Sequence, residues 1–296
     1  MNHLSSLDQI VEQSVSQLAN ETDEVHKSGF FREYLDVIAK FWRYSYRNQL
    51  LIHVQRRDAS RIAGFRKWNE LGRKVLKGSK AIKILAPFTK KIKEKDSIGE
   101  EKEVSRTYFF PVNVFDVSQT IGKPLPEISL EVEGNNQQQL LNKLLEYCAL
   151  QNIKTEFKEL GINGLYGYSS GGKIAVDSKQ SINTQVNTLI HEIAHELTHY
   201  SKEGKKFSRQ EKEIQAEATN YVITKALGLQ NKSSTYLALY IKDKDKILEN
   251  LSVISKTAKE ILLHLDCQEQ QNFFNAQVSN TETIIFPNQK TTKEAI

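Results

Sequence analysis

Apolar side chains recur at helical spacing through the first part of the chain. Within residues 4–27 they lie three or four positions apart, and this spacing predicts one amphipathic helix that buries Leu4, Leu7, Val11, Val15 and Leu18. A second helix is predicted over residues 30–42. Ser45 can cap a third helix, which ends near Gln55 and buries Leu50, Leu51 and Val54. The chain is therefore expected to begin with three helices.

Alternation replaces helical spacing after residue 60. Residues 61–65 predict a short strand, and residues 67–71 predict one helical turn that stops at Gly72. Residues 80–88 predict a longer strand. Its inner side would carry Ile82, Ile84 and Ala86, and its outer side Lys83. The charged run 90–103 predicts a long, mobile hairpin tip before a return strand over 106–117.

A break in every periodic pattern separates two halves of the chain. The stretch 118–134 contains Gly122, Pro124, Pro126 and Gly134, which is typical of a linker. We therefore expect one domain over residues 1–120, a linker over 121–134 and a second domain over 135–270.

The second half mixes helices and strands. The pattern predicts a helix over 137–150, strands over 153–157 and 173–176, a glycine-rich connection over 161–172, and two long helices, around 186–197 and 209–227. Residues 271–296 predict a polar tail. The chain as a whole predicts an α+β fold of two domains.

Composition excludes several classes of protein. With 296 residues, 39% of them hydrophobic and 26% charged, the chain can bury a core in each half. Cys148 and Cys267 are too few for a disulfide framework, so reduced thiols and a cytoplasmic location are expected. No run of 18 apolar residues and no signal-peptide pattern occurs, so no membrane association is expected.

The net charge of +5 conceals a strong segregation. Residues 40–93 hold 16 Lys or Arg against Asp58 and Glu70, so this stretch carries +14 and the rest of the chain −9. Such a block is typical of a surface that binds nucleic acid. A solvated basic face over an aromatic core would give the same pattern.

Aromatic residues are interleaved with these cations, which favours single-stranded DNA because unpaired bases can stack on them. The candidate phosphate or sugar contacts are Arg43, Arg47, Asn48, Lys74, Lys77 and Lys80. Tyr46 and Trp68 are the stacking candidates, although burial in the core is the favoured interpretation of Trp68. Slight sequence preference and strong salt dependence are expected.

The sharpest chemical signal is His191-Glu192-Ile193-Ala194-His195, within an apolar helical pattern. Side chains four residues apart lie on one helical face, so the two histidines can bind one zinc ion. Glu192 flanks that position without being a ligand. It can act as the general base for a zinc-activated water that attacks a peptide bond, which predicts a metallopeptidase with one zinc per chain.

The helix predicted over 209–227 can supply the third protein ligand that such a site needs. Glu213 is the candidate ligand. Glu217 lies one turn later and can accept the second N–H of a ligand imidazole. Spacing alone leaves the reverse assignment of these two carboxylates open, and both could merely belong to a solvated face.

Other residues near this motif have more than one interpretation. His199 continues the stripe, but three ligands on one straight helix cannot converge tetrahedrally, so it is expected to make a supporting contact. Residues 173–177 predict either an edge strand beside the substrate or an inner strand. Tyr166 and Tyr168 could donate to an oxyanion or simply pack.

Segments 44–52, 62–78 and 82–87 occur together in the basic block. In combination they resemble the N-terminal domain of ArdC-type antirestriction proteins, over about residues 5–230 when the histidine motif is included. The resemblance implies a single-stranded DNA-binding domain followed by a zincin-like, gluzincin-type metallopeptidase domain. That second part is also similar to the ImmA/IrrE peptidases. The charged insertion at 90–103 and the residues after 232 depart from the family.

The resemblance also implies a function, namely protection of the incoming DNA of plasmids and other mobile elements from restriction enzymes. The leading hypothesis is DNA-guided proteolysis of an unidentified protein, either DNA-bound or part of the restriction system, with Glu192 as the base. A second hypothesis is a non-enzymatic protein with a structural zinc site that protects DNA stoichiometrically. A third is a regulatory peptidase that cleaves a repressor.

Overall fold

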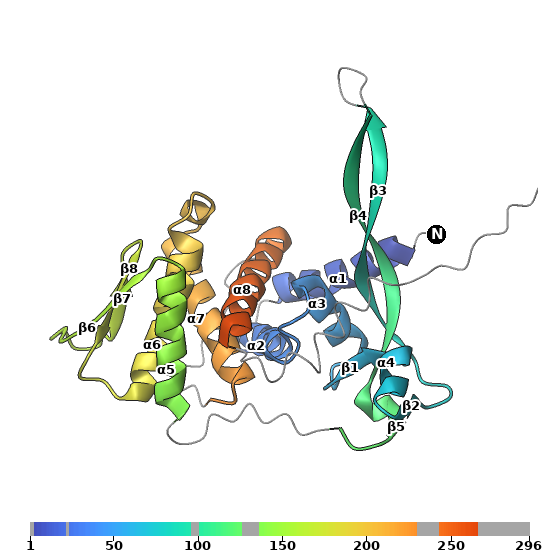
Figure 1. Ribbon diagram of the computed structural model, residues 1–296, viewed down its shortest axis with the longest axis horizontal. Coiled ribbons are helices and arrows are strands. Elements are labelled where there is room, and N and C mark those ends of the chain that lie inside the picture. Colours follow the sequence, from blue (N-terminus) through green and yellow to red (C-terminus); the bar gives the residue numbers. More distant parts are fainter. Residues whose placement is uncertain (1–2, 22–23, 96–100, 126–135, 230–242, 266–296) are drawn as a thin grey trace, which may run out of the picture.

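The computed structural model of this chain describes residues 3–21, 24–95, 101–125, 136–229 and 243–265. Helices fill the middle of the molecule, a small sheet lies at one end, and a long two-stranded ribbon rises from the other (Figure 1). The mixed α+β character is confirmed. No helix within the described ranges is long and apolar enough to cross a membrane.

Three helices begin the chain, as α1 (His3–Asn20), α2 (Glu24–Lys40) and α3 (Tyr46–Gln55). The single helix expected over 4–27 is wrong, because the apolar spacing ends at Leu18 and the polar residues that follow separate α1 from α2. The Ser45 cap is confirmed, since its hydroxyl accepts the backbone N–H of Asn48 at 3.4 Å. Leu50 and Leu51 are buried as expected, whereas Val54 is 39% exposed.

The N-terminal part also holds two small sheets. Its remaining elements are β1 (Ile62–Gly64), α4 (Phe65–Glu70), β2 (Arg73–Val75), β3 (Ile82–Lys95), β4 (Glu101–Asp116), η1 (Val117–Gln119) and β5 (Thr120–Gly122). Strands β1, β4 and β3 form one antiparallel sheet in that order, and β2 pairs with β5. As expected, Ile82, Ile84 and Ala86 face the core and Lys83 faces outward.

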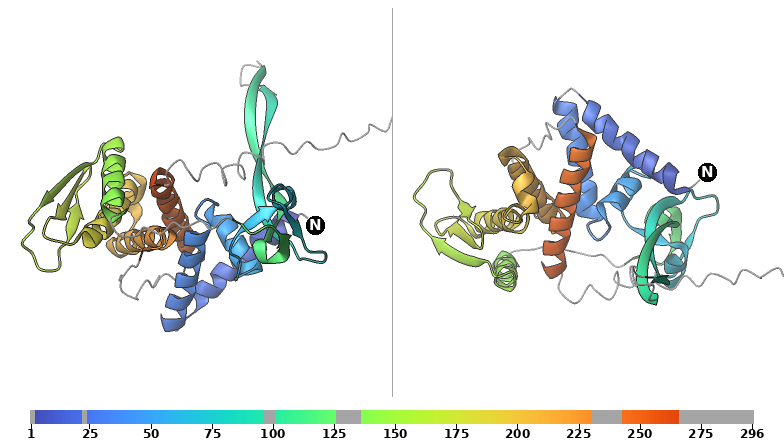
Figure 2. Two further views of the ribbon diagram at one scale, coloured as in Figure 1. Left: turned by 60° about the horizontal axis from the view of Figure 1, so that its bottom comes forward. Right: turned by 90° about the horizontal axis from the view of Figure 1, so that it is seen from above.

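The hairpin is longer and more regular than predicted. Strands β3 and β4 pair continuously from Ile82↔Val114 to Lys95↔Glu101, so most of the run 90–103 is strand, not mobile tip. Cross-strand hydrogen bonds pair the backbone N–H and C=O groups of a charged segment as well as those of an apolar one. The pattern of apolar and polar residues therefore does not reveal this pairing. The resulting ribbon projects well clear of the helices (Figure 2).

The predicted linker begins too early. Residues 120–122 are strand β5, and the guanidinium of Arg73 donates to Thr120 Oγ1 at 2.7 Å and to Thr120 O at 3.0 Å. Residues 121 and 122 therefore belong to the N-terminal part. Residues 126–135, in the rest of the predicted linker, lie outside the described ranges, as does the predicted polar tail at 271–296.

The second half of the chain contains four α-helices, one 3-10 helix and one sheet in the described ranges. They are α5 (Asn136–Leu150), β6 (Lys154–Lys158), β7 (Gly167–Ser169), β8 (Lys173–Asp177), α6 (Ile182–His199), η2 (Glu203–Lys206), α7 (Arg209–Ala226) and α8 (Lys244–Leu265). Strand β8 is the inner strand in the order β6-β8-β7, pairing parallel with β6 and antiparallel with β7. Sequence reasoning missed β7, a three-residue strand inside the glycine-rich connection.

The two halves share one hydrophobic core. Leu18, Leu35 and Leu51 belong to the same buried cluster as Leu144 and Ile254. Helix α8 lies between the halves, in contact with α1 and α3 on one side and with α5, α6 and α7 on the other. A smaller cluster packs α2 and α3 against the base of the ribbon. The division into domains 1–120 and 135–270 stays a prediction.

A buried carboxylate holds the segment between α3 and β1. Asp116 accepts hydrogen bonds from the backbone N–H groups of Ser60, Arg61 and Ser118 at 2.7, 3.1 and 3.0 Å. Burial raises the pKa of Asp116, but the bonds from Ser118, Ser60 and Arg61 outweigh burial and hold the pKa below its ordinary value of 3.8.

Replacing Asp116 by alanine is expected to lower the free energy of unfolding by about 2–3 kcal/mol at pH 7, because buried donors lose their acceptor. The folded pKa is depressed, so this stabilisation is present above the ordinary aspartate pKa and is lost as the pH falls through the folded value. Urea unfolding at pH 7 and pH 3 measures both effects. An equal difference between wild type and variant at the two pH values would contradict the assignment.

Candidate metal centre

Two capped helices carry the residues of the histidine motif and its partners. Ser181 begins α6 by accepting the N–H of Thr184, and Ser208 begins α7 in a capping box with Glu211. The apolar face of α6 is buried, which turns the histidines of the opposite face toward α7. Glu211 is occupied by the cap and takes no part in the site.

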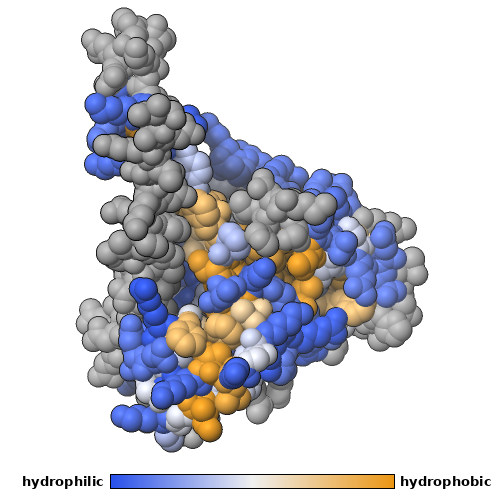
Figure 3. Space-filling model, turned by 90° about the vertical axis from the view of Figure 1, so that its right-hand side faces the viewer, coloured by the Kyte–Doolittle hydropathy of each residue, from blue (hydrophilic) through white to orange (hydrophobic). Residues whose placement is uncertain are grey.

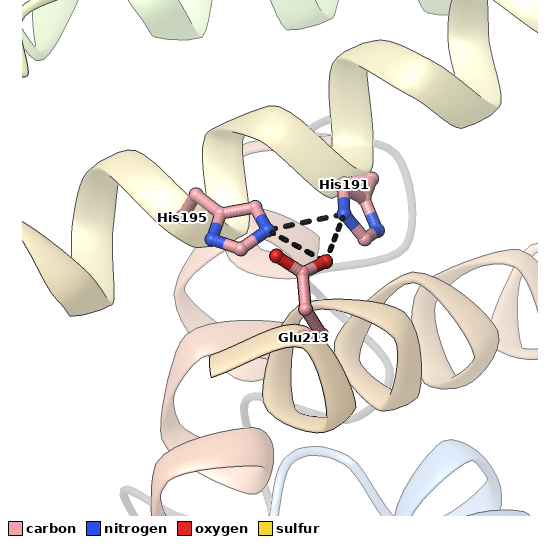
Figure 4. A group of neighbouring side chains, drawn as sticks. All are labelled: His191, His195 and Glu213. Atoms are coloured by element: carbon pink, nitrogen blue, oxygen red, sulfur yellow. Dashed lines mark hydrogen bonds and ion pairs between the residues drawn. The ribbon is translucent and has the colours of Figure 1, made fainter. Parts of the chain in front are cut away.

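Three donor atoms from α6 and α7 converge (Figure 4). Nε2 of His191 lies 3.1 Å from Nε2 of His195, and Oε2 of Glu213 lies 3.7 Å from each of these nitrogens. Atoms that bind a tetrahedral zinc ion at about 2.0–2.1 Å are about 3.3 Å apart. The donor types and their spacing thus fit a divalent metal ion. Among the residues the structure describes, only these three form such a His, Cys, Asp or Glu group.

A chain of side-chain hydrogen bonds sets the tautomer of His195. Gln215 Nε2 donates to Asn250 Oδ1 at 2.8 Å, so its Oε1 accepts from Nε2 of His199 at 2.9 Å. Nδ1 of His199 is then an acceptor, and Nδ1 of His195 donates to it at 2.8 Å. This order leaves the Nε2 lone pair of His195 directed at the site. His199 thus lies between His195 and Gln215, and its role in supporting a metal ligand stays a prediction.

Glu217 contacts the other ring nitrogen of His191. Its Oε2 lies 3.3 Å from Nδ1 of His191, on the side of the ring away from Glu213. Burial lowers the pKa of His191, but hydrogen bonds to Glu213 and Glu217 outweigh burial and raise the pKa to about 9. The same imidazoles hold the pKa of Glu213 well below its usual range. The arrangement strongly favours a positive charge between α6 and α7.

Glu192 lies beside these donors and is buried. Burial raises the pKa of its carboxyl above the ordinary value, against the opposing effect of His191 and His195. The hydroxyl of Ser169, on β7, donates a hydrogen bond to it. A raised pKa suits a carboxylate that takes and returns a proton near neutral pH.

Strand β7 packs closely against α6. A Cβ on Gly167 would lie 2.5 Å from Cγ2 of Thr188, so only glycine allows this approach. Beyond β7, the carboxylate of Glu196 accepts the backbone N–H groups of Ser170, Gly171 and Gly172 at 3.1, 2.9 and 2.6 Å. Sequence reasoning did not single out Glu196, although its place directly after the second histidine and opposite a Ser-Ser-Gly-Gly turn was a usable signal.

Replacing Glu196 by alanine is expected to loosen this turn without removing the metal donors. Hydrogen bonds to a charged group contribute about 1.5–3 kcal/mol, so amide exchange at residues 170–172 should accelerate roughly tenfold or more. Hydrogen exchange measured by NMR or mass spectrometry tests this, with the exposed Glu203→Ala as the control. Unchanged exchange would show that the carboxylate does not hold the turn.

The structure places the other residues that were considered for peptide binding or for an oxyanion donor. Residues 173–177 form the inner strand β8, so they cannot be an edge strand beside a substrate. Strand β7 lies at an edge of this sheet. Tyr168 alternates with Gly167 and Ser169 and so points away from α6, where its hydroxyl accepts a hydrogen bond from Nζ of Lys158 at 3.0 Å. It cannot serve as an oxyanion donor there. Tyr166 is 49% exposed, and its role as an oxyanion donor stays a prediction.

Two of the predicted DNA contacts are corrected by burial. Trp68 is 1% exposed and its indole N–H donates to Phe115 O at 2.9 Å, so it belongs to the core and cannot stack on a base. Asn48 is 7% exposed and exchanges two 2.8 Å hydrogen bonds with the backbone of Leu85, so its role is to join α3 to β3.

The other predicted DNA contacts lie nearer the surface. Arg47 is bonded to Asp8 at 2.8 Å, and the guanidinium of Arg43 lies 4.6 Å from the centre of the Trp42 ring. Tyr46 is partly buried against the main core. Lys74, Lys77 and Lys80 are exposed. The roles of these residues in DNA binding stay predictions.

Comparison with known proteins identifies the N-terminal part. The family described as the N-terminal domain of anti-restriction factor ArdC matches residues 6–115. This chain carries an ArdC domain. The resemblance to ArdC-type proteins inferred from the basic block is thereby confirmed, and the matched range runs from α1 into β4, with the ribbon included.

Relatives extend beyond the ArdC domain. An uncharacterized protein of Bacillus anthracis is 27% identical over 278 residues, which covers 79% of this chain and 47% of that protein. The chain thus spans about half the length of this curated relative. The Mn(II)-bound crystal structure of antirestriction ArdC protein from the R388 plasmid matches with a TM-score of 0.51 and 16% identity, over 89% of this chain and 99% of that one. The metal-free structure of that protein matches with a TM-score of 0.43 and 18% identity, over 84% and 97%.

Proposed function

We propose that this chain is an antirestriction protein that binds single-stranded DNA and cleaves a protein substrate at a zinc centre. The observation that carries the proposal is the convergence of His191, His195 and Glu213, with Glu192 beside them. Acid-base and metal donors in this arrangement are what peptide hydrolysis requires. The ArdC domain supports the link to DNA and to antirestriction.

The donor set supports zinc as the metal. Two imidazoles and one carboxylate are ligands that zinc accepts readily. The R388 protein with a similar fold was crystallised with Mn(II), which supports a divalent ion in proteins of this type. We propose that Glu213 ligates and Glu217 supports His191, because Oε2 of Glu213 is equidistant from both Nε2 atoms and Glu217 contacts only Nδ1.

A divalent ion held here would lower the pKa of a water molecule and polarise a peptide carbonyl. Glu192 would take the proton of that water as its oxygen attacks the carbonyl carbon. The same carboxyl would return the proton to the nitrogen as the C–N bond breaks. Ser169 orients the Glu192 carboxylate. An extended peptide added to the outer edge of β7 would present its carbonyl to this side of α6.

The proposal couples DNA binding to proteolysis, and this coupling has a direct test. Purified zinc-loaded protein is incubated with restriction-enzyme subunits or unfolded casein, with and without a single-stranded oligonucleotide. Faster cleavage with the oligonucleotide supports the coupling. An identical rate in both cases would leave a peptidase that DNA does not regulate.

A second candidate function is stoichiometric protection of DNA, with a metal that only stabilises the fold. The observation that favours it is the family match itself, which covers the ArdC domain and not the metal centre. Replacement of Glu192 separates the two functions, because only proteolysis needs its carboxylate.

A further inference from the structure

The ribbon of β3 and β4 carries surface residues that the metal centre and the core do not use. In an antiparallel pair, residues directly opposite each other share a face, and that face recurs every second residue. One face therefore holds the pairs Ile84↔Val112, Ala86↔Phe110, Phe88↔Tyr108 and Lys90↔Arg106 in order from base to tip. We call this the aromatic face of the ribbon.

The lower end of the aromatic face is core and its upper end is surface. Ile84 and Ala86 are buried, whereas Phe88, Tyr108 and Phe110 are 37%, 43% and 43% exposed. Phe88 and Phe110 are in edge contact, with ring centroids 5.9 Å apart. Three large aromatic rings in solvent on a projecting hairpin lose hydrophobic stabilisation that burial would provide, which indicates a binding role.

Both faces of the ribbon carry cations. On the opposite face Lys93 lies across from Glu103, and Lys91 forms an ion pair with Glu103 at 3.5 Å. On the aromatic face Lys90 lies directly across from Arg106, and nearer the tip Glu94 lies across from Lys102. In Figure 3 hydrophilic residues lie high on this side of the molecule, and hydrophobic residues gather in its middle and lower part.

We propose that the aromatic face of the ribbon is a binding site for single-stranded DNA, in which Phe88, Tyr108 and Phe110 stack on bases and Lys90 and Arg106 contact phosphates. The inference rests on the proposed single-stranded DNA binding and assigns its location. Unpaired bases expose the faces that aromatic rings need, whereas stacked duplex bases do not. The site lies apart from Lys74, Lys77 and Lys80, which the sequence favoured.

The test measures binding of the full chain to a fluorescein-labelled oligo-dT of about 20 nucleotides, longer than a typical single-strand site. Phe88→Ala, Tyr108→Ala and Phe110→Ala are each expected to weaken binding roughly tenfold. Phe109→Ala is the matched control, since Phe109 is 52% exposed on the opposite face of the same strand and should bind like wild type. Lys90→Gln and Arg106→Gln should each reduce the salt slope by about 0.7.

The outcomes separate this inference from the proposed function. If wild type binds oligo-dT and all three aromatic variants bind it with the same affinity, the aromatic face is not the binding site. The proposed function would still stand. Failure of wild type to bind oligo-dT would overturn both. Tighter binding to the corresponding duplex would overturn the stacking role. If sedimentation shows that wild type is a dimer and that Phe110→Ala is a monomer, the aromatic face is a self-association surface and not a DNA site.

Discussion

Protein purified without chelator is expected to carry about one equivalent of zinc, and the Glu213→Ala variant is expected to lose it. The carboxylate of Glu213 lies 3.7 Å from Nε2 of both histidines, so its removal leaves two ligands on one helix. His191→Ala should have the same effect. Elemental analysis and competition with a coloured chelator measure the metal content and the affinity.

Glu217→Ala is the informative comparison. Its contact with Nδ1 of His191 predicts retained metal with about 10- to 100-fold weaker affinity, as for residues that orient a ligand. The opposite ranking, with Glu217→Ala losing more metal than Glu213→Ala, would exchange the two roles. Wild type that binds no metal after zinc is supplied would overturn the peptidase proposal and leave stoichiometric DNA protection.

Glu192→Gln is expected to lower the turnover of a protein substrate by about 10²- to 10⁴-fold, the usual contribution of a general base. Glutamine keeps the shape of the side chain and can still accept the hydrogen bond from Ser169, but it cannot take a proton. Metal content and binding to oligo-dT should equal those of wild type. Peptide release measured by mass spectrometry gives the rate.

The control for this variant is Glu203→Gln, an exposed glutamate in η2 outside the site. Antirestriction is measured in parallel as the survival of incoming DNA in a restricting host. Loss of protection in Glu192→Gln alone supports proteolysis as the mechanism. Full protection by Glu192→Gln would show that the chain acts by binding and not by cleavage.

Sequence reasoning located the candidate metal donors because their pattern is local. Helical spacing places His191 and His195 on one face, and the apolar residues between them set which face is buried. The pairing of α6 with α7 could be inferred only from the chemistry, since zinc needs a third ligand. The choice between Glu213 and Glu217 depends on how α6 and α7 pack against each other. The spacing of residues along one helix holds no information about that packing.

The errors concern structure that depends on distant residues. Nothing near Asn48 in the sequence indicates that the backbone of Leu85 exchanges hydrogen bonds with its amide. Burial of Trp68 was the favoured interpretation, and only the acceptor of its indole N–H, Phe115 O, was not predicted. Strand β7 exists because β8 and α6 support it, although its own sequence is rich in glycine. The ribbon extends through a charged run because each strand satisfies the backbone of the other.

Helix α8 has a consequence for how the chain loses its structure. Its buried side chains belong to the core that α1 and α3 share with α5 to α7, and Ser255 donates to Gln49 at 2.9 Å while Asn250 accepts from Gln215. Removal of α8 would strip apolar contacts from both halves at once. We therefore expect the helical body to unfold in one cooperative transition, with both halves losing structure together. A truncated version that ends before Lys244 would be aggregation-prone, because each half would expose apolar surface that α8 covers.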